Sequence, residues 1–406
     1  MPNGDNWQGD VLRDLRGGAQ PAAPGPGGQQ QPMTGPGAGA PGAGGQVPAG
    51  AAPDPAYGYP HQDPAAATAG PAHAAPQGHR PPQPRQQAPY ASGGSAQAPR
   101  TPESRPAVDR SLAGVGRGAR RGEPFAARAV RAVRRTVSSS ASREVAEATR
   151  AAELLQQPVT TGRQIAVTSI RGGAGKSTVA ALLGTTYAHY RQDPVLFVEA
   201  DPALGSLPIR LGAETLRWTT GDVADIVEPQ MSLLDITGYL VQLRDNAWLL
   251  PGSQGQIGAM LDTRSYERAM VALRRYFGVT VVDCETLPAE VARVALSASQ
   301  ARVLTTPATL DGVSSTHAVL QWMQGLPPHV MASTVVVLTE QAPRSGIDLA
   351  EAVRTLQAAG PSVHVLAYDR HLADGGHIRT ELLAHSTRQT AAALAADVFQ
   401  LSQKRH

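Results

Sequence analysis

A glycine cluster followed by one lysine and two hydroxyl residues stands between an apolar run and a helical pattern in AVTSIRGGAGKSTVAALLGTTYAHY, residues 166–190. Glycines at these positions let the backbone curl so that successive amides point at one anion. A helix beginning at Lys176 adds the partial positive charge of its N-terminus. The lysine ammonium is expected on the β- and γ-phosphates of a nucleotide, and the Ser177 hydroxyl on Mg²⁺. The expected nucleotide contacts are Gly172, Gly173, Ala174, Gly175, Lys176, Ser177 and Thr178.

Two later apolar runs end in carboxylates. The run PVLFVEADP carries Glu199 and Asp201, and the run VTVVDCE carries Asp283 and Glu285. Four apolar or β-branched residues followed by aspartate have the Walker B form, whose carboxylate holds Mg²⁺ directly or through water. Ser177 and Asp283 are therefore the predicted metal ligands.

These residues need a scaffold that brings the ends of several strands together. Short apolar runs recur along the second half of the chain, with amphipathic helical stretches such as KSTVAALLGTTYAHY and EVARVALSASQ between them. Continuous apolar strands alternating with helices predict an α/β fold, a mostly parallel doubly wound sheet covered on both faces. Ligands of such sheets bind beyond the carboxyl ends of the strands. The expected strands are QIAVTSI, PVLFVEA, VTVVDC, ARVLTT, STVVVLT and SVHVLAY.

The ordinary P-loop pattern wants a glycine where this chain has Ile170. What remains, RGGAGKST, resembles the deviant Walker A motif of the ParA/MinD family of P-loop ATPases, of the SIMIBI type. The resemblance implies ATP and Mg²⁺ as cofactors, an ATP-dependent homodimer and an ATPase of low intrinsic turnover. In that family the residue before the glycine pair is a signature lysine that reaches the partner subunit's nucleotide. Here Arg171 departs from the pattern, although a guanidinium also suits phosphate oxygens.

The same resemblance assigns roles to other residues. It implies that Asp201 orients or activates the attacking water, and that Lys176 and Arg171 act with it as catalytic residues. The segment VLAYDRHLADGG resembles the family's loop beside the adenine, with Ala367 in place of a proline and Asp369 among the residues that contact the nucleotide. Arginine supplies nearly every basic residue of the chain, yet one of its two lysines stands at position 176. A compact ammonium fits between phosphates where a broad guanidinium does not, which supports the phosphate loop.

Composition divides the 406-residue chain, because 42 glycines and 34 prolines are too many for one packed fold. Residues 1–108 are rich in Pro, Gly, Ala and Gln and predict a disordered head. Residues 109–157 predict a basic helical linker, in which the arginines of 110–137 surround a thin apolar face. Residues 158–406 predict the ATPase domain.

Three functions are left open by the sequence. A Pro-rich head on this ATPase most resembles the ParA-like proteins associated with type VII (ESX) secretion, which favours a dimerisation switch that positions a secretion partner through the head. Arginines 110–137 would instead suit chromosome or plasmid partitioning through non-specific DNA contact, or contact with an anionic membrane. Arg171, Glu285 and Ala367 would suit a weakly hydrolysing nucleotide-binding scaffold.

Cellular location follows from what the sequence lacks. The single cysteine, Cys284, excludes an intramolecular disulfide framework. A formal net charge of only +3 does not call for a polyanionic partner. Without an apolar run of about 18 residues or a secretory signal, we expect a cytoplasmic protein, with a peripheral position at membrane or nucleoid as the alternatives offered by the basic segment.

Overall fold

The computed structural model describes residues 101–112, 140–203, 205–256 and 258–404. At their centre is a sheet of eight strands in the order β10-β9-β8-β2-β7-β3-β6-β5. All neighbouring strands in it are parallel except β5 and β6, which are antiparallel. The strands are β2 (Arg163–Ser169), β3 (Val195–Ala200), β5 (Val241–Gln242), β6 (Ala247–Leu250), β7 (Val279–Cys284), β8 (Ala301–Pro307), β9 (Thr334–Thr339) and β10 (Ser362–Leu366).

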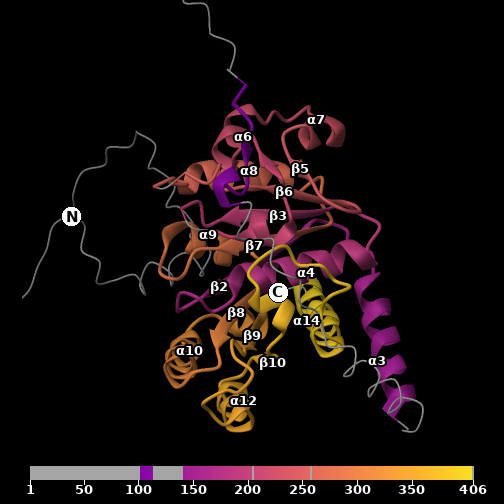
Figure 1. Ribbon diagram of the computed structural model, residues 1–406, viewed down its shortest axis with the longest axis vertical. Helices are drawn as coiled ribbons and strands as arrows, with labels where there is room; N and C mark the ends of the chain where they lie inside the picture. The colour runs from indigo at the N-terminus through magenta and orange to yellow at the C-terminus, as the bar shows by residue number, and fades with distance from the viewer. Residues whose placement is uncertain (1–100, 113–139, 204, 257, 405–406) are drawn as a thin grey trace, which may run out of the picture. The chain divides into compact units, whose positions relative to one another are not determined.

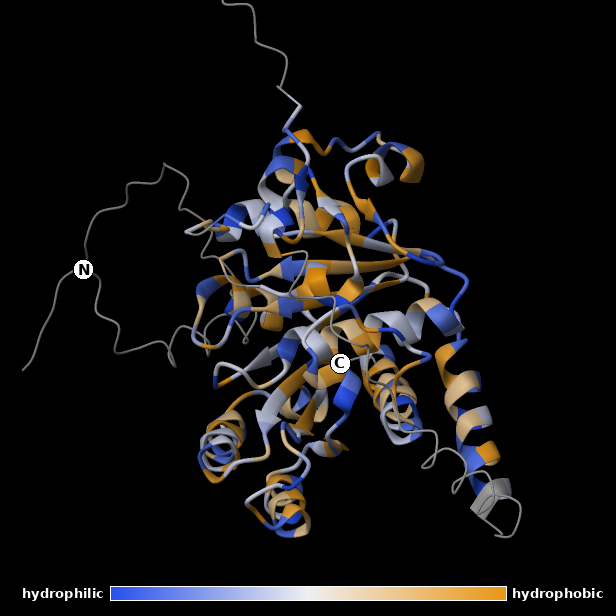
Figure 2. Cartoon of the chain, viewed as in Figure 1, coloured by the Kyte–Doolittle hydropathy of each residue, from blue (hydrophilic) through white to orange (hydrophobic). Residues whose placement is uncertain are grey.

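Helices cover both faces of this sheet, so the predicted doubly wound α/β fold is confirmed. Alternate residues of β7 show the two faces, since Val281 packs in one core cluster and Val282 in another. One face carries α4 (Lys176–Tyr190) and α14 (His385–Gln403); the other carries α6 (Thr220–Ile226), α8 (Thr263–Leu273), α9 (Glu290–Ala298), α10 (Leu310–Met323) and α12 (Leu349–Ala358). Figure 1 shows α14 and α10 on opposite sides of β8 and β9, and Figure 2 shows apolar residues concentrated along the strands.

Every strand predicted from an apolar run is confirmed, and α4 begins and ends where its pattern predicted. The runs succeed because β3, β7 and β8 are buried along their whole length, as strands covered on both faces must be. Shorter elements were not predicted. They include β1 (Arg105–Pro106), β4 (Thr215–Leu216), β5 and β6, and the short helices α5 (Leu207–Leu211), α7 (Leu233–Thr237), α11 (Pro328–Ala332) and α13 (Arg370–Ala373).

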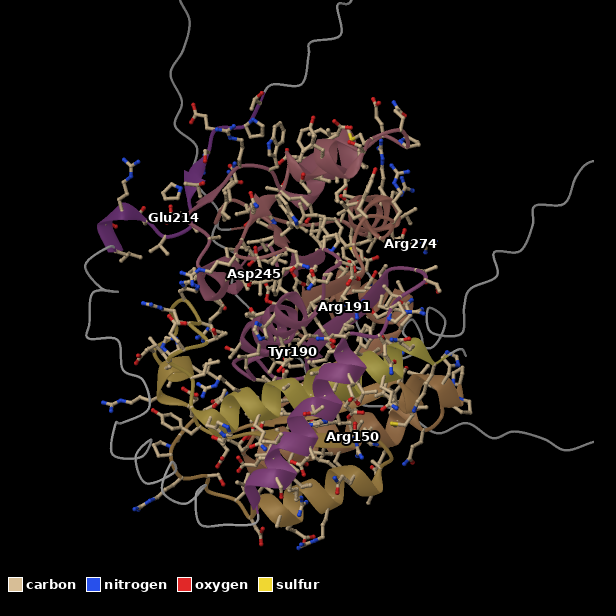
Figure 3. The ribbon with its side chains drawn as sticks, turned by 90° about the vertical axis from the view of Figure 1, so that its right-hand side faces the viewer. Arg150, Tyr190, Arg191, Glu214, Asp245 and Arg274 are labelled. Carbon is tan, nitrogen blue, oxygen red and sulfur yellow. The ribbon has the colours of Figure 1, made fainter. Side chains whose placement is uncertain are left out.

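Residues that precede the ATPase domain in sequence contact it. Helix α3 (Ser140–Leu155) packs on α14, and Leu155 is fully buried. The guanidinium of Arg191 donates to the carbonyls of Leu155 (2.7 Å) and Gln157 (3.0 Å) and lies 4.5 Å from the centre of the Phe399 ring. Figure 3 shows α3 crossing α14, with Arg191 beside one end of α3. The predicted head up to residue 100 and most of the predicted basic helix, residues 113–139, lie outside the described residues.

Within the described ranges, no helix is both long enough and apolar enough to cross a bilayer.

Candidate functional site

The glycine-rich loop joins the end of β2 to the start of α4, as its sequence predicted. Gly173 (φ 73°) and Gly175 (φ 83°) adopt left-handed backbone conformations that other residues rarely take. A Cβ atom added at Gly172 or Gly173 would meet nothing within 4 Å, so the outer side of the loop is open to a ligand. Gly175, the N-cap of α4, makes no side-chain capping bond, which leaves the first amides of the helix for a ligand to accept from.

The inner side of the loop is held by hydrogen bonds to its carbonyls. The Ser169 hydroxyl donates to the carbonyl of Arg171 (2.8 Å). From β9, the Thr339 hydroxyl donates to the carbonyl of Ala174 (3.1 Å). The Gln341 amide, just after β9, donates to the carbonyl of Gly173. Thr339 and Gln341 were not predicted, because their role depends on β9 lying two strands away from β2.

Lys176 reaches from the start of α4 to the end of β7. Its ammonium donates to the Thr286 hydroxyl at 3.1 Å. The loop after β7 is also fixed to β2, because the amide of Leu287 donates to the carbonyl of Ser169 (2.9 Å). The predicted phosphate lysine and the predicted Walker B strand are thus brought together. Thr286 was missed because a lone threonine three residues after the Walker B aspartate carries no signal of its own.

Asp283 lies on the face of the sheet that α4 covers. It is fully buried, and neither of its carboxylate oxygens has a hydrogen-bond partner within the described residues. Burial raises the pKa of Asp283 to about 7, and Asp201 adds to this rise, while the neighbouring Ser177 hydroxyl and Lys176 ammonium oppose it. A buried carboxylate without a partner is costly, so its presence here calls for a cation or a donor. The two predicted metal ligands are therefore neighbours.

Three other carboxylates gather around Asp283 at the carboxyl ends of β3 and β7. Glu199 pairs in register with Asp283 across these strands. Burial raises the pKa of Glu199 to about 8, with Asp283 and Asp201 adding to the rise, and the Gly252 amide opposes it by donating to the carboxylate at 3.2 Å. Burial also raises the pKa of Glu285, again with a contribution from Asp201. Asp201 is thus electrostatically coupled to each of the others.

Metal binding by protein side chains alone is not supported. No group of three or more His, Cys, Asp or Glu side chains could hold a metal ion among the described residues. Mg²⁺ in nucleotide sites takes one or two protein oxygens, with phosphates and waters supplying the rest. One hydroxyl and one buried carboxylate, Ser177 and Asp283, fit that type of site.

Arg171 is exposed and directed at its own chain. Its Nε and Nη2 atoms donate to the Ser315 hydroxyl on α10, at 3.1 and 3.0 Å. The Ser315 hydroxyl in turn donates to the carbonyl of Asp311 (2.7 Å). The guanidinium is therefore held beside the loop by α10.

The Asp369 carboxylate has a structural role, because it accepts hydrogen bonds from two segments of the chain. Asp369 is buried and begins α13, where it accepts from the amides of His371 (2.8 Å) and Leu372 (3.4 Å). Its other oxygen accepts from the Ala384 amide (2.8 Å) and the Thr387 hydroxyl (2.6 Å). The carboxylate has no oxygen to spare for a base, so any nucleotide contact here would come from the backbone.

Sequence comparisons find relatives, although no protein-family model matches the chain. The chain is 28% identical over 253 residues to the ESX-1 secretion-associated protein EspI of Mycobacterium tuberculosis, which covers 60% of this chain and 37% of EspI. It is 32% identical over 152 residues to the septum site-determining protein MinD of Thermotoga maritima, covering 36% of this chain and 53% of MinD. The chain thus spans little more than a third of EspI and about half of MinD.

Solved structures similar to the fold include a ParA family ATPase from Chlorobium tepidum, with a TM-score of 0.49 and 14% identity over 57% of this chain and 98% of that one. Another is MinD of Pyrococcus horikoshii in complex with Mg-ADP, with a TM-score of 0.43 and 19% identity over 60% of this chain and 96% of that one. By sequence, part of this chain is thus similar to EspI and to MinD.

Proposed function

We propose that this chain binds Mg·ATP at the loop between β2 and α4 and hydrolyses it slowly. The observation that carries the proposal is the pairing of an open glycine loop with Asp283, a fully buried carboxylate that has no hydrogen-bond partner among the described residues. Bound magnesium would compensate that buried charge, and a triphosphate would engage the uncapped start of α4. The sequence relationship to MinD supports the same function.

Each side chain has a defined task in this proposal. Lys176 holds phosphate oxygens, exchanging its bond to the Thr286 hydroxyl for charge-assisted bonds. Ser177 and Asp283 hold Mg²⁺, which neutralises charge on the phosphates when bound. Asp201 follows β3 directly and is partly exposed, so it can orient a water molecule for attack on the terminal phosphate.

The two lysines of the chain provide a matched test. In Lys176→Ala we expect ATP affinity to fall on the order of 100-fold, as expected when charge-assisted hydrogen bonds to phosphate are lost. Lys404→Ala, at the exposed end of α14, should leave affinity unchanged. Calorimetry with Mg·ATP measures both. Equal affinities in the two variants, or no heat of binding in the wild type, would refute the proposal.

We further propose that ATP holds two copies of the chain together and that hydrolysis releases them, so that the N-terminal region is presented in pairs to a partner. The similarity to the ESX-1 secretion-associated protein EspI favours a partner in type VII secretion. Size-exclusion chromatography of the full chain with ATP, with ADP and without nucleotide tests the switch: a dimer is expected with ATP alone. Salt-sensitive retention on DNA, lost with residues 110–137, would favour the partitioning function instead.

A further inference from the structure

The loop after β6, residues 251–255, contains no residue with an assigned role in the proposed chemistry, yet it touches the turn that carries Asp201. The Ser253 hydroxyl, which is buried, donates to the carbonyl of Pro202 at 2.6 Å. Beside it, the Gly252 amide donates to the Glu199 carboxylate. The loop therefore holds the residues on either side of Asp201, one through a hydroxyl and one through an amide.

Close packing leaves little freedom between these two segments. A Cβ atom added at Gly252 would lie 2.7 Å from the carbonyl oxygen of Glu199 and 3.1 Å from the Cα of Pro202. The turn is also closed internally, because the Gly205 amide donates to the carbonyl of Asp201 at 2.9 Å. The position of Asp201 is thus fixed to that of the loop.

The opposite end of the same loop is tied to residues 101–107, which we call the N-terminal strap. The side-chain amide of Gln254 donates both to the carbonyl of Glu103 (2.8 Å) and to the carbonyl of Arg217 (2.6 Å). The strap is held further by pairing of β1 with β4 and by the Ala107 amide, which donates to the carbonyl of Glu214 at 2.9 Å. The Gln254 side chain therefore joins the strap, the residue that follows β4 and the loop after β6.

We propose that Ser253 and Gln254 are positioning residues through which the N-terminal strap sets the geometry of Asp201. The strap directly follows the first 100 residues in the sequence. Movement of the strap shifts Gln254, then the loop after β6, and then the Pro202 carbonyl. Displacements of about 1 Å near reacting groups are enough to change rates strongly. The proposal rests on the proposed function, since it treats Asp201 as the residue that orients water.

Two neighbouring glutamines give a matched pair for the test. Gln254 bridges the two segments, whereas the Gln256 side chain is exposed two residues away. In the full chain, Gln254→Ala should lower kcat for ATP several-fold while ATP affinity stays within about twofold, because the phosphate loop is untouched. Ser253→Ala should lower kcat further, because it leaves a buried carbonyl unpaired. Gln256→Ala should behave as wild type.

Hydrogen exchange supplies a readout that does not depend on turnover. In Gln254→Ala, peptides covering 101–107 and 199–206 should both exchange faster than in wild type, and in Gln256→Ala neither should. Faster exchange in 101–107 alone would overturn the inference, because the strap would then not reach the Asp201 turn. A wild type that fails to bind ATP would refute the proposed function, whereas unchanged exchange in 199–206 refutes this inference by itself.

Discussion

The loop after β2 and the loop after β6 lie at the same edge of the sheet but are built on opposite principles. The loop after β2 carries its chemistry in its own residues: left-handed glycines, a lysine and a serine. The loop after β6 carries none, and acts through a hydroxyl and an amide that hold the turn of Asp201. Residues that touch a ligand are constrained in type, whereas residues that hold them are constrained mainly in place. Residues that touch a ligand can therefore be recognised from the sequence, whereas residues that hold them in place can be recognised only once the fold is known.

The largest expected effect separates binding from turnover. Asp201→Asn should lower kcat on the order of 100-fold or more, because a positioned carboxylate that orients or activates water typically contributes this much. ATP affinity should change little, since the phosphate loop and Asp283 are intact. Single-turnover phosphate release and calorimetry measure the two quantities.

Asp225 offers a control, as an exposed aspartate on α6. Asp225→Asn should turn over as wild type does. If Asp201→Asn lost ATP affinity by the same factor as kcat, then binding would not belong to the loop after β2 alone, and the contrast between the two loops would be wrong.

The fold was readable from sequence where burial is complete. Runs such as VTVVDC are apolar on both faces because both faces of the sheet are covered, so their ends, and hence Asp283, were placed correctly. The short edge strand β5, Val241–Gln242, was missed because two residues, one half-buried and one exposed, are too few to show a periodicity. The pairing of Arg105–Pro106 with β4 was missed because a Pro-rich sequence predicts no strand.

The candidate site was predictable only in part, because only some of its residues stand in sequence motifs. Lys176, Ser177 and Asp283 stand in recognisable motifs, and the structure brings them together. Thr339 holds the glycine loop by a bond to Ala174 over 165 residues of sequence, and Ser253 holds Pro202 over 51. Threonines and serines in loops are common, so only their position in the fold distinguishes these two.

A second prediction concerns Glu199, which accepts from the loop after β6, and the pH dependence of the protein's stability. Because burial raises the pKa of Glu199 to about 8, the folded protein keeps a proton on this group that the unfolded chain releases above its ordinary pKa of 4.5. The stability that this group contributes is therefore fully present below about pH 4.5 and is lost as the pH rises toward 8, by on the order of 5 kcal/mol. Glu199→Gln keeps an acceptor for the Gly252 amide and removes the titration.

Urea unfolding at pH 5 and pH 8 tests this. The difference in unfolding free energy between the two pH values should be smaller in Glu199→Gln than in wild type, and at pH 8 the variant should be the more stable. A variant as sensitive to pH as the wild type would show that Glu199 is ionised in the folded protein and bears its charge without cost.

The smallest expected effect is on the stability of the ATP-dependent dimer and concerns Arg171, the residue of the loop after β2 that is hydrogen-bonded to α10. Its guanidinium binds Ser315 of the same chain, so Arg171→Ala and Ser315→Ala should each leave ATP affinity within about twofold. Their effects on the ATP-dependent dimer should be opposite if Arg171 reaches the nucleotide of a second copy. Arg171→Ala removes the contact and weakens the dimer, whereas Ser315→Ala frees the guanidinium from a bond worth about 1 kcal/mol and strengthens the dimer up to about fivefold. Analytical ultracentrifugation with ATP measures both, and effects of the same sign would show that the arginine serves only its own chain.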